Sequence, residues 1–161
     1  MNTAVKLISA CLIVLLAACS KKEGPQELMQ GVDSRQENVI LSYLRAHNET
    51  ATKDVSGLYY NILEAGDSIH FVKATSIPTV VYTNRLLNGQ IVGSSIGPTD
   101  FDQRELKNHI PGWQIGLQKI SRGGRIRLYI PPALAYGPTG IAGLIPPDAV
   151  LISDIELVNI R

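Results

Sequence analysis

Strand-like spacing of apolar residues runs through most of the chain after Gly57, and it constrains the fold more than any other feature. Residues two apart in a strand lie on the same face, so a period of two indicates a half-buried β-strand. Four segments show strand character: Leu58, Tyr60 and Ile62; Thr79 to Leu87; Ile126, Leu128 and Ile130; and Leu151, Ser153, Ile155 and Leu157. These segments predict a mostly antiparallel sheet.

A hairpin and one short helix complete this pattern. Asn88-Gly89 follows the second strand segment and supplies the positive φ angles that a two-residue hairpin turn requires, so residues 90–92 form the returning strand. A helix is predicted to begin after Pro111, because three apolar residues then share one helical face: Trp113, Leu117 and Ile120. The chain is therefore predicted to have an α+β fold, with the short helix against one face of the sheet.

A second helix is predicted upstream, within residues 32–50. Ser34 and Glu37 have the spacing of a capping box, in which each side chain satisfies a free backbone N–H at the start of a helix. The predicted helix ends near His47-Asn48, and its apolar stripe consists of Val39, Ile40, Tyr43 and Leu44. This stripe could pack on its own domain or on a second copy of the chain, and we favour the first arrangement.

The first 18 residues resemble a bacterial lipoprotein signal peptide. A short basic start precedes an apolar run that is shorter than the roughly 20 residues of a bilayer-spanning helix, and Leu16-Ala17-Ala18-Cys19 closes it. Cleavage before Cys19 would make this residue the lipid anchor, with acyl chains such as palmitate inserted in a membrane. Residues 19–31 would then be a polar tether and residues 52–161 a single folded domain. The alternatives are ordinary signal cleavage and an uncleaved anchor.

Cysteine use and charge narrow the possible chemistry. Cys11 would leave with the signal peptide and Cys19 would carry lipid, so the exported domain would have no cysteine for a disulfide, a nucleophile or a metal. Without Lys6 the chain has 14 basic and 14 acidic residues, which argues against nucleic acid as a partner. The remaining cluster of basic residues is interpreted as the solvated face of a strand: Arg122, Arg125 and Arg127. We expect no metal, because the three histidines lack ligand spacing, and no cofactor, because the sequence has neither a phosphate-binding Gly-rich Lys motif nor a dinucleotide fingerprint.

Four segments together resemble FKBP-type peptidyl-prolyl cis-trans isomerases. They are Val81-Tyr82-Thr83, Ile110-Pro111-Gly112-Trp113, Ala135-Tyr136-Gly137-Pro138-Thr139-Gly140 and Leu144 to Leu151. The resemblance covers residues 52–161 and implies a twisted antiparallel sheet wrapped around one short helix. It also implies isomerase activity on X-Pro peptide bonds.

The resemblance assigns a role to each matching residue. Trp113 resembles the indole that forms the floor under the proline ring, and Ile110 the residue whose backbone N–H holds a ligand carbonyl. Tyr82 resembles a wall tyrosine, and Tyr136 the tyrosine whose hydroxyl donates to the ligand. Two further residues match the apolar loop that overhangs the cleft: Leu144 and Ile145. Since buried tyrosine and tryptophan also occur as ordinary core residues, the alternative for each aromatic is packing alone.

Three positions depart from the family pattern. Val92 stands where a Phe wall is usual, Gly93 where an Asp is usual, and Ser153 where an aromatic residue is frequent. Loss of a buried aromatic face removes about 1 to 3 kcal/mol of apolar contact, so the resemblance predicts reduced isomerase activity. Phe101 follows closely and could refill part of the lost volume as a substrate-binding residue.

Other functions remain open at this stage. Gly93-Ser94-Ser95-Ile96-Gly97 fits the pattern of a hydrolase nucleophile elbow, but the chain is too short for the large α/β sheet that such an elbow requires. Besides an isomerase of exported Pro-containing polypeptides, the same fold could serve as a non-catalytic binding module or chaperone. It could also be an envelope-complex lipoprotein that docks, or forms a homodimer, through residues 34–47. The expected location is the bacterial cell envelope, on the outer membrane.

Overall fold

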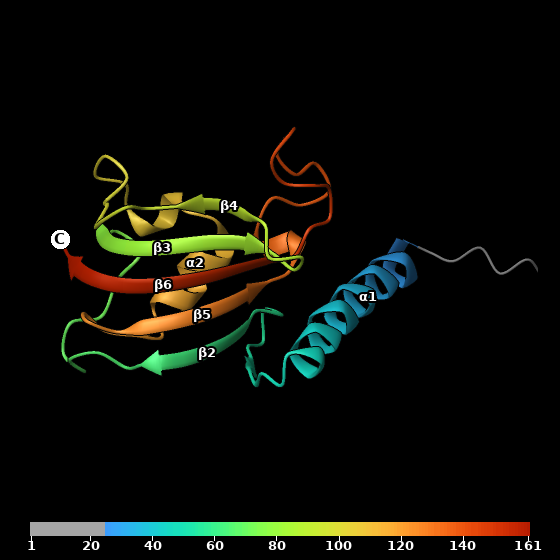
Figure 1. The fold of residues 1–161 in the computed structure, drawn as a ribbon, viewed down its shortest axis with the longest axis horizontal. Helices are drawn as coiled ribbons and strands as arrows, with labels where there is room; N and C mark the ends of the chain where they lie inside the picture. Colours follow the sequence, from blue (N-terminus) through green and yellow to red (C-terminus); the bar gives the residue numbers. More distant parts are fainter. Residues whose placement is uncertain (1–24) are drawn as a thin grey trace, which may run out of the picture.

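The computed structural model describes residues 25–161, and these form one six-stranded antiparallel sheet with helices beside it (Figure 1). The strand order is β1-β2-β5-β6-β3-β4, which places the last strand of the chain in the interior of the sheet. The bounds are β1 (Thr52–Lys53), β2 (Tyr59–Glu64), β3 (Pro78–Leu86), β4 (Ile91–Ser94), β5 (Arg125–Ile130) and β6 (Leu151–Ile160). The predicted α+β class is confirmed. Ile62 is 39 % exposed, however, so the predicted buried face of β2 ends at Tyr60.

The main core lies between the sheet and helix α2 (Pro111–Leu117). A 3-10 turn, Leu106–Asn108, precedes this helix, and a second, Pro132–Leu134, follows β5. Pro111 occupies the first helical turn, where its missing N–H would have had no partner. Trp113, Leu117 and Ile120 are all buried, as predicted, but the helix ends at Leu117, so Ile120 reaches the core from the turn that follows α2 rather than from the helix face. A Cβ added at Gly116 would lie 2.6 Å from Leu128 Cδ1, so the missing side chain lets α2 pack closely on β5.

Helix α1 (Pro25–Ala46) is longer than the sequence indicated. It starts at a proline, which is tolerated at the first helical position, and therefore includes residues 25–31 of the predicted tether. The predicted capping box is wrong because Ser34 lies inside the helix, where the backbone N–H groups already have helical partners. The predicted end is confirmed, with Asn48 in the left-handed region at φ 53°.

The C-terminal part of α1 packs on its own domain. Ile40 and Leu44 are buried in a second apolar cluster with residues of β2, β5, β6 and the residue before β6: Tyr59, Tyr129, Ile152 and Val150. Polar contacts reinforce this packing, because Glu37 accepts hydrogen bonds from Lys53 at 2.6 Å and from the Tyr59 hydroxyl at 2.5 Å. Burial, and then Glu37, raise the pKa of Tyr59 to about 12, so its hydroxyl remains a donor. The favoured of the two packing arrangements is the one observed.

No helix within residues 25–161 is both long and apolar enough to cross a membrane. The predicted signal peptide and Cys19 lie outside the described residues, as does the first part of the predicted tether. Lipid anchoring therefore stays a prediction.

The β3–β4 hairpin differs in detail from its prediction. Of the two predicted turn residues, Gly89 has a positive φ, at 87°, and Asn88 does not. The N–H of Leu86 donates to the Gln90 carbonyl at 2.9 Å. The Gly89 N–H also donates to the Leu86 carbonyl at 2.9 Å. These bonds enclose a three-residue loop with Gly89 as its left-handed residue, the usual longer alternative to the two-residue turn.

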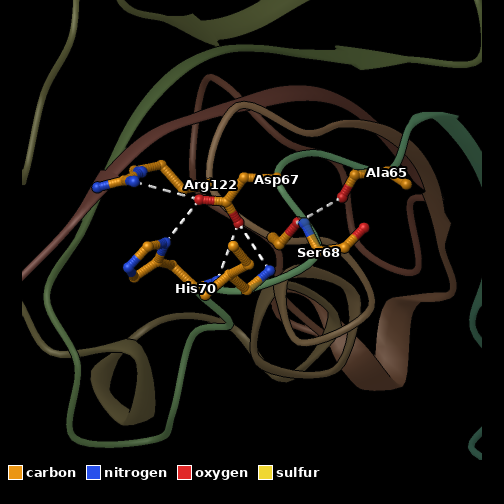
Figure 2. Close-up of polar contacts among 7 residues, drawn as sticks. Ala65, Asp67, Ser68, His70 and Arg122 are labelled. Carbon is orange, nitrogen blue, oxygen red and sulfur yellow. Dashed lines mark hydrogen bonds and ion pairs between the residues drawn. The ribbon is translucent and has the colours of Figure 1, made fainter.

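A polar cluster orders the loop between β2 and β3 (Figure 2). Asp67 accepts hydrogen bonds from the backbone N–H groups of Ile69 and His70 and contacts the His70 ring at 2.6 Å and Arg122 at 3.2 Å. The pKa of the Asp67 carboxyl is lowered, chiefly by the hydrogen bond from the His70 N–H and next by the one from the Ile69 N–H. Arg122 thus lies in a loop rather than on the predicted strand face, and its ion pair with Asp67 connects this loop to the one between β2 and β3.

Candidate functional site

A pocket of about 200 Å³ lies where the start of α2, strand β3 and the loop before α2 meet. Five of the residues predicted as site residues line it together: Tyr82, Phe101, Ile110, Trp113 and Tyr136. Four further lining residues were not predicted: Asn84, Arg104, Asn108 and His109. The structure thus brings the central part of the predicted site into one cavity.

Aromatic rings form the floor and walls of this pocket. The indole of Trp113 is buried, and the ring of Tyr82 meets it edge-on with centroids 5.1 Å apart. Phe101 closes a third side, 5.3 Å from Tyr82 and 5.8 Å from Trp113. Centroid distances of 4.5 to 7 Å in tilted arrangements are favourable for aromatic pairs. The floor and wall residues therefore hold each other in place around the cavity.

Phe101 reaches the pocket through a strained turn. Phe101, Asp102 and Gln103 have φ values of 53°, 58° and 64°, so three successive non-glycine residues are left-handed. Each such residue costs about 1 to 2 kcal/mol. Asp100 stabilises the turn, because its carbonyl accepts the Arg104 N–H at 2.9 Å and its carboxylate pairs with Arg161. Backbone strain of this kind is typical of functional sites.

Unused hydrogen-bond donors face the aromatic walls. Within the described part of the chain, neither the Ile110 N–H nor the hydroxyls of Tyr82 and Tyr136 donate to another residue. Burial, and next the neighbouring Tyr82, raise the pKa of the Tyr136 hydroxyl, which therefore stays protonated at neutral pH. The pocket can thus offer several donors to the carbonyl oxygens of a bound peptide.

The remaining predicted contacts lie outside the lining. Val92 on β4 is partly buried against the main core, and Gly93 beside it leaves the neighbouring pocket wall open. Ile145 is only 5 % exposed and belongs to the core, whereas Leu144 is 41 % exposed. Direct contact of Val92, Leu144 and Ile145 with substrate stays a prediction.

Ser153, predicted only as a missing aromatic, has a polar role. It is fully buried, accepts the Trp113 indole N–H at 3.1 Å, and donates to the Asn84 side-chain oxygen at 2.6 Å. The sequence held a signal for Asn84, because residues 82 and 84 share one face of a strand. The hydrogen bonds from strand to strand that orient it could not be read from the sequence.

His109 forms a further wall that the sequence assigned only to surface or core. Its ring stacks on Trp113 with centroids 5.4 Å apart and an interplanar angle of 14°. Burial, and next the charge of Arg104, lower the pKa of His109, and its Nε2 is buried without a partner in the described chain. The imidazole is therefore neutral at neutral pH and acts as an aromatic wall.

The hydrolase alternative is not supported by the surroundings of Ser95. Its hydroxyl accepts the backbone N–H of Tyr82 at 3.1 Å, and its own N–H donates to the Tyr82 carbonyl, so the residue completes the pairing beyond β4. No strand-to-helix elbow surrounds it in residues 25–161. Among these residues there is also no group of His, Cys, Asp and Glu that could hold a metal ion.

Comparison with known proteins agrees with this site. The sequence profile of the FKBP-type peptidyl-prolyl cis-trans isomerases matches residues 70–158. A probable FKBP-type isomerase of Haemophilus influenzae is 38 % identical over 106 residues, which cover 66 % of this chain and 44 % of that protein. FK506-binding protein 1 of Saccharomyces cerevisiae is 39 % identical over 101 residues, covering 62 % of this chain and 89 % of that one.

Solved structures with a similar fold belong to the same kind of protein. The crystal structure of FkpA from Escherichia coli superposes with a TM-score of 0.69 and 32 % identity, covering 84 % of this chain and 64 % of that one. The match spans less than half the length of the Haemophilus relative, so the agreement concerns the β-sheet domain alone. The chain belongs to the FKBP-type peptidyl-prolyl cis-trans isomerase family.

Proposed function

We propose that this chain catalyses cis–trans isomerisation of X-Pro peptide bonds. The observation that carries the proposal is the pocket itself, in which Trp113, Tyr82 and Phe101 surround a space that faces the free donors of Ile110 and Tyr136. Rotation about an X-Pro bond is slow because planarity preserves amide resonance, with a barrier of about 18 to 20 kcal/mol. The mechanism must therefore favour the twisted amide.

The geometry offers two contributions to this. The planar amide is the more charge-separated form, so transfer from water to the aromatic walls of the pocket disfavours it relative to the twisted form. Hydrogen bonds from Ile110 and Tyr136 to neighbouring carbonyl oxygens would hold the peptide in a conformation suited to the twisted bond. A thousandfold acceleration needs only about 4 kcal/mol of such differential binding. Rotation about the C–N bond transfers no proton, so no general acid or base is required.

The proposed activity is attenuated. Val92 lies on β4 outside the pocket lining, Gly93 adds no side chain, and Ser153 presents a hydroxyl where relatives often carry a ring. The substitution Val92→Phe should rebuild an apolar wall and raise kcat/KM by about tenfold, corresponding to roughly 1.4 kcal/mol. An unchanged kcat/KM in this variant would contradict the attenuation.

We further propose that the substrates are exported Pro-containing polypeptides and that the chain is anchored in the bacterial envelope through Cys19. The support is the lipoprotein-like signal in the sequence. Detergent-phase partitioning of the native chain and a Cys19→Ser variant tests the anchor. Partitioning of both into the aqueous phase would contradict it.

A second candidate is a binding module that holds proline segments without useful turnover, and its support is the polar lining residue Asn84, which Ser153 holds from behind the pocket. A docking or dimer-forming role for residues 34–47 is compatible with the exposed Val39, which is 43 % accessible, but Ile40 and Leu44 are already used internally. Saturable peptide binding without acceleration of isomerisation would favour the binding module.

A further inference from the structure

A buried chain of hydrogen bonds runs under the pocket from α2 through β6 to β3. The Trp113 Nε1–H donates to Ser153 Oγ at 3.1 Å, and Ser153 Oγ donates to Asn84 Oδ1 at 2.6 Å. Ser153 is fully buried and Asn84 is 9 % exposed. All three groups are thus fixed by protein contacts.

The chemistry of these groups determines which way the Asn84 amide points. An indole nitrogen is only a donor, so Ser153 Oγ must be its acceptor. The Ser153 hydrogen then has one remaining partner in the described chain, which is the Asn84 side chain. The group facing Ser153 is therefore the amide oxygen, and the amide nitrogen points away from it.

The Asn84 nitrogen faces the open wall of the pocket. Asn84 lines the pocket, and its Nδ2 donates to no residue in the described part of the chain. A Cβ added at Gly93 would lie 3.8 Å from Asn84 Nδ2 and 3.8 Å from Tyr82 Oη. The glycine therefore leaves an oriented amide donor bare, beside a tyrosine hydroxyl.

A segment containing proline is a suitable acceptor for this donor. Proline has no backbone N–H, so the peptide around it presents more carbonyl acceptors than N–H donors. We propose that Asn84 Nδ2 donates a hydrogen bond to a main-chain carbonyl oxygen of the bound Pro-containing segment. This assignment rests on the proposed function and adds a substrate-binding residue to the same pocket.

The alternative is that Asn84 only orients Trp113 through Ser153. That role uses Oδ1 alone, whereas substrate binding uses Nδ2. Asn84→Asp separates the two, because it keeps the volume and the acceptor for Ser153 but replaces the donor by a second acceptor. A matched control is Asn61→Asp, which makes the same change of charge on β2, outside the lining.

The test is a fluorescence titration of the full chain with a short, end-blocked X-Pro peptide. Trp113 is the single tryptophan of the chain, so its emission reports the pocket directly. At pH 7, Asn84→Asp should weaken binding by tenfold or more, and Asn61→Asp by less than twofold. Lowering the pH below the ordinary carboxyl pKa should restore affinity in Asn84→Asp relative to the unsubstituted chain at the same pH, because a protonated carboxyl donates again.

Two outcomes would overturn the assignment: unchanged affinity in Asn84→Asp, or a loss that does not recover at low pH. A parallel isomerisation assay separates this inference from the proposed function. Absence of acceleration by the unsubstituted chain, together with Asn84-dependent binding, would overturn the function and support the inference. Acceleration with binding that is indifferent to Asn84→Asp would overturn the inference alone.

Discussion

Gly116→Ala should destabilise the fold because α2 has no room for a methyl group above β5. The added Cβ would lie 2.6 Å from both Cδ1 and Cδ2 of Leu128, which is fully buried. Overpacking of this kind costs about 1 to 3 kcal/mol, while Gly→Ala in a helix returns up to about 1 kcal/mol. The expected net loss is about 1 to 2 kcal/mol, and for a chain of this size each kcal/mol lowers Tm by roughly 2 to 4 °C.

Thermal unfolding followed by circular dichroism measures this effect. Gly97→Ala is the matched control, because a Cβ there meets nothing within 4 Å and its φ is not positive. Leu128→Ala removes both methyl groups in the way, so a double-mutant cycle should show Gly116→Ala to be less destabilising in that background. Equal melting temperatures for Gly116→Ala and Gly97→Ala would refute the close packing that positions Trp113.

Three further outcomes are expected. The 2.6 Å contact with Lys119 chiefly lowers the pKa of Asp54 to about 2, so its stabilisation is present above pH 4 and lost as the pH falls toward 2. In urea titrations the stability difference between the native chain and Asp54→Asn should therefore shrink by about 1 kcal/mol from pH 5 to pH 2, and a constant difference would contradict this. Gln103→Gly should raise Tm by relieving a left-handed residue, whereas Glu105→Gly, at φ −63°, should lower it; the opposite order would argue against strain. Arg104 lines the pocket, and in the described chain no acidic residue pairs with it. At low salt a Glu-Pro peptide should therefore bind about two- to threefold tighter than a Lys-Pro peptide, and equal affinities would contradict this.

Local periodicity was sufficient to predict most of the sheet and the short helix. The helix face with Trp113 and Leu117 and the strands around Ile126 and Leu151 appear as expected, because a buried face imposes its period on the sequence. Ile120 is buried as predicted, but it follows the end of the helix. The start of α1 was predicted at Ser34 because of the capping-box spacing, whereas the helix begins nine residues earlier, at Pro25. Such local signals compete, and the sequence contains no measure of which one prevails.

The site was predictable to the extent that short motifs carry it. Tyr82, Ile110, Trp113 and Tyr136 lie in matching segments and meet in one pocket. Asn84 and Ser153 are 69 positions apart, and their hydrogen bond depends on the register between β3 and β6, which pairs them directly. Only the fold supplies that register, which is why the hydrogen bond between Asn84 and Ser153 could not be derived from residue spacing.

The most direct test of the proposed activity is the rate of cis–trans isomerisation of a short X-Pro peptide with the purified chain and its Tyr136→Phe variant. The uncatalysed reaction takes tens to hundreds of seconds, so even a weak catalyst is measurable. We expect the chain to accelerate isomerisation and the variant to be about two- to tenfold slower, as expected for loss of one hydrogen bond. No acceleration at concentrations that saturate peptide binding, or equal rates for both proteins, would contradict the account.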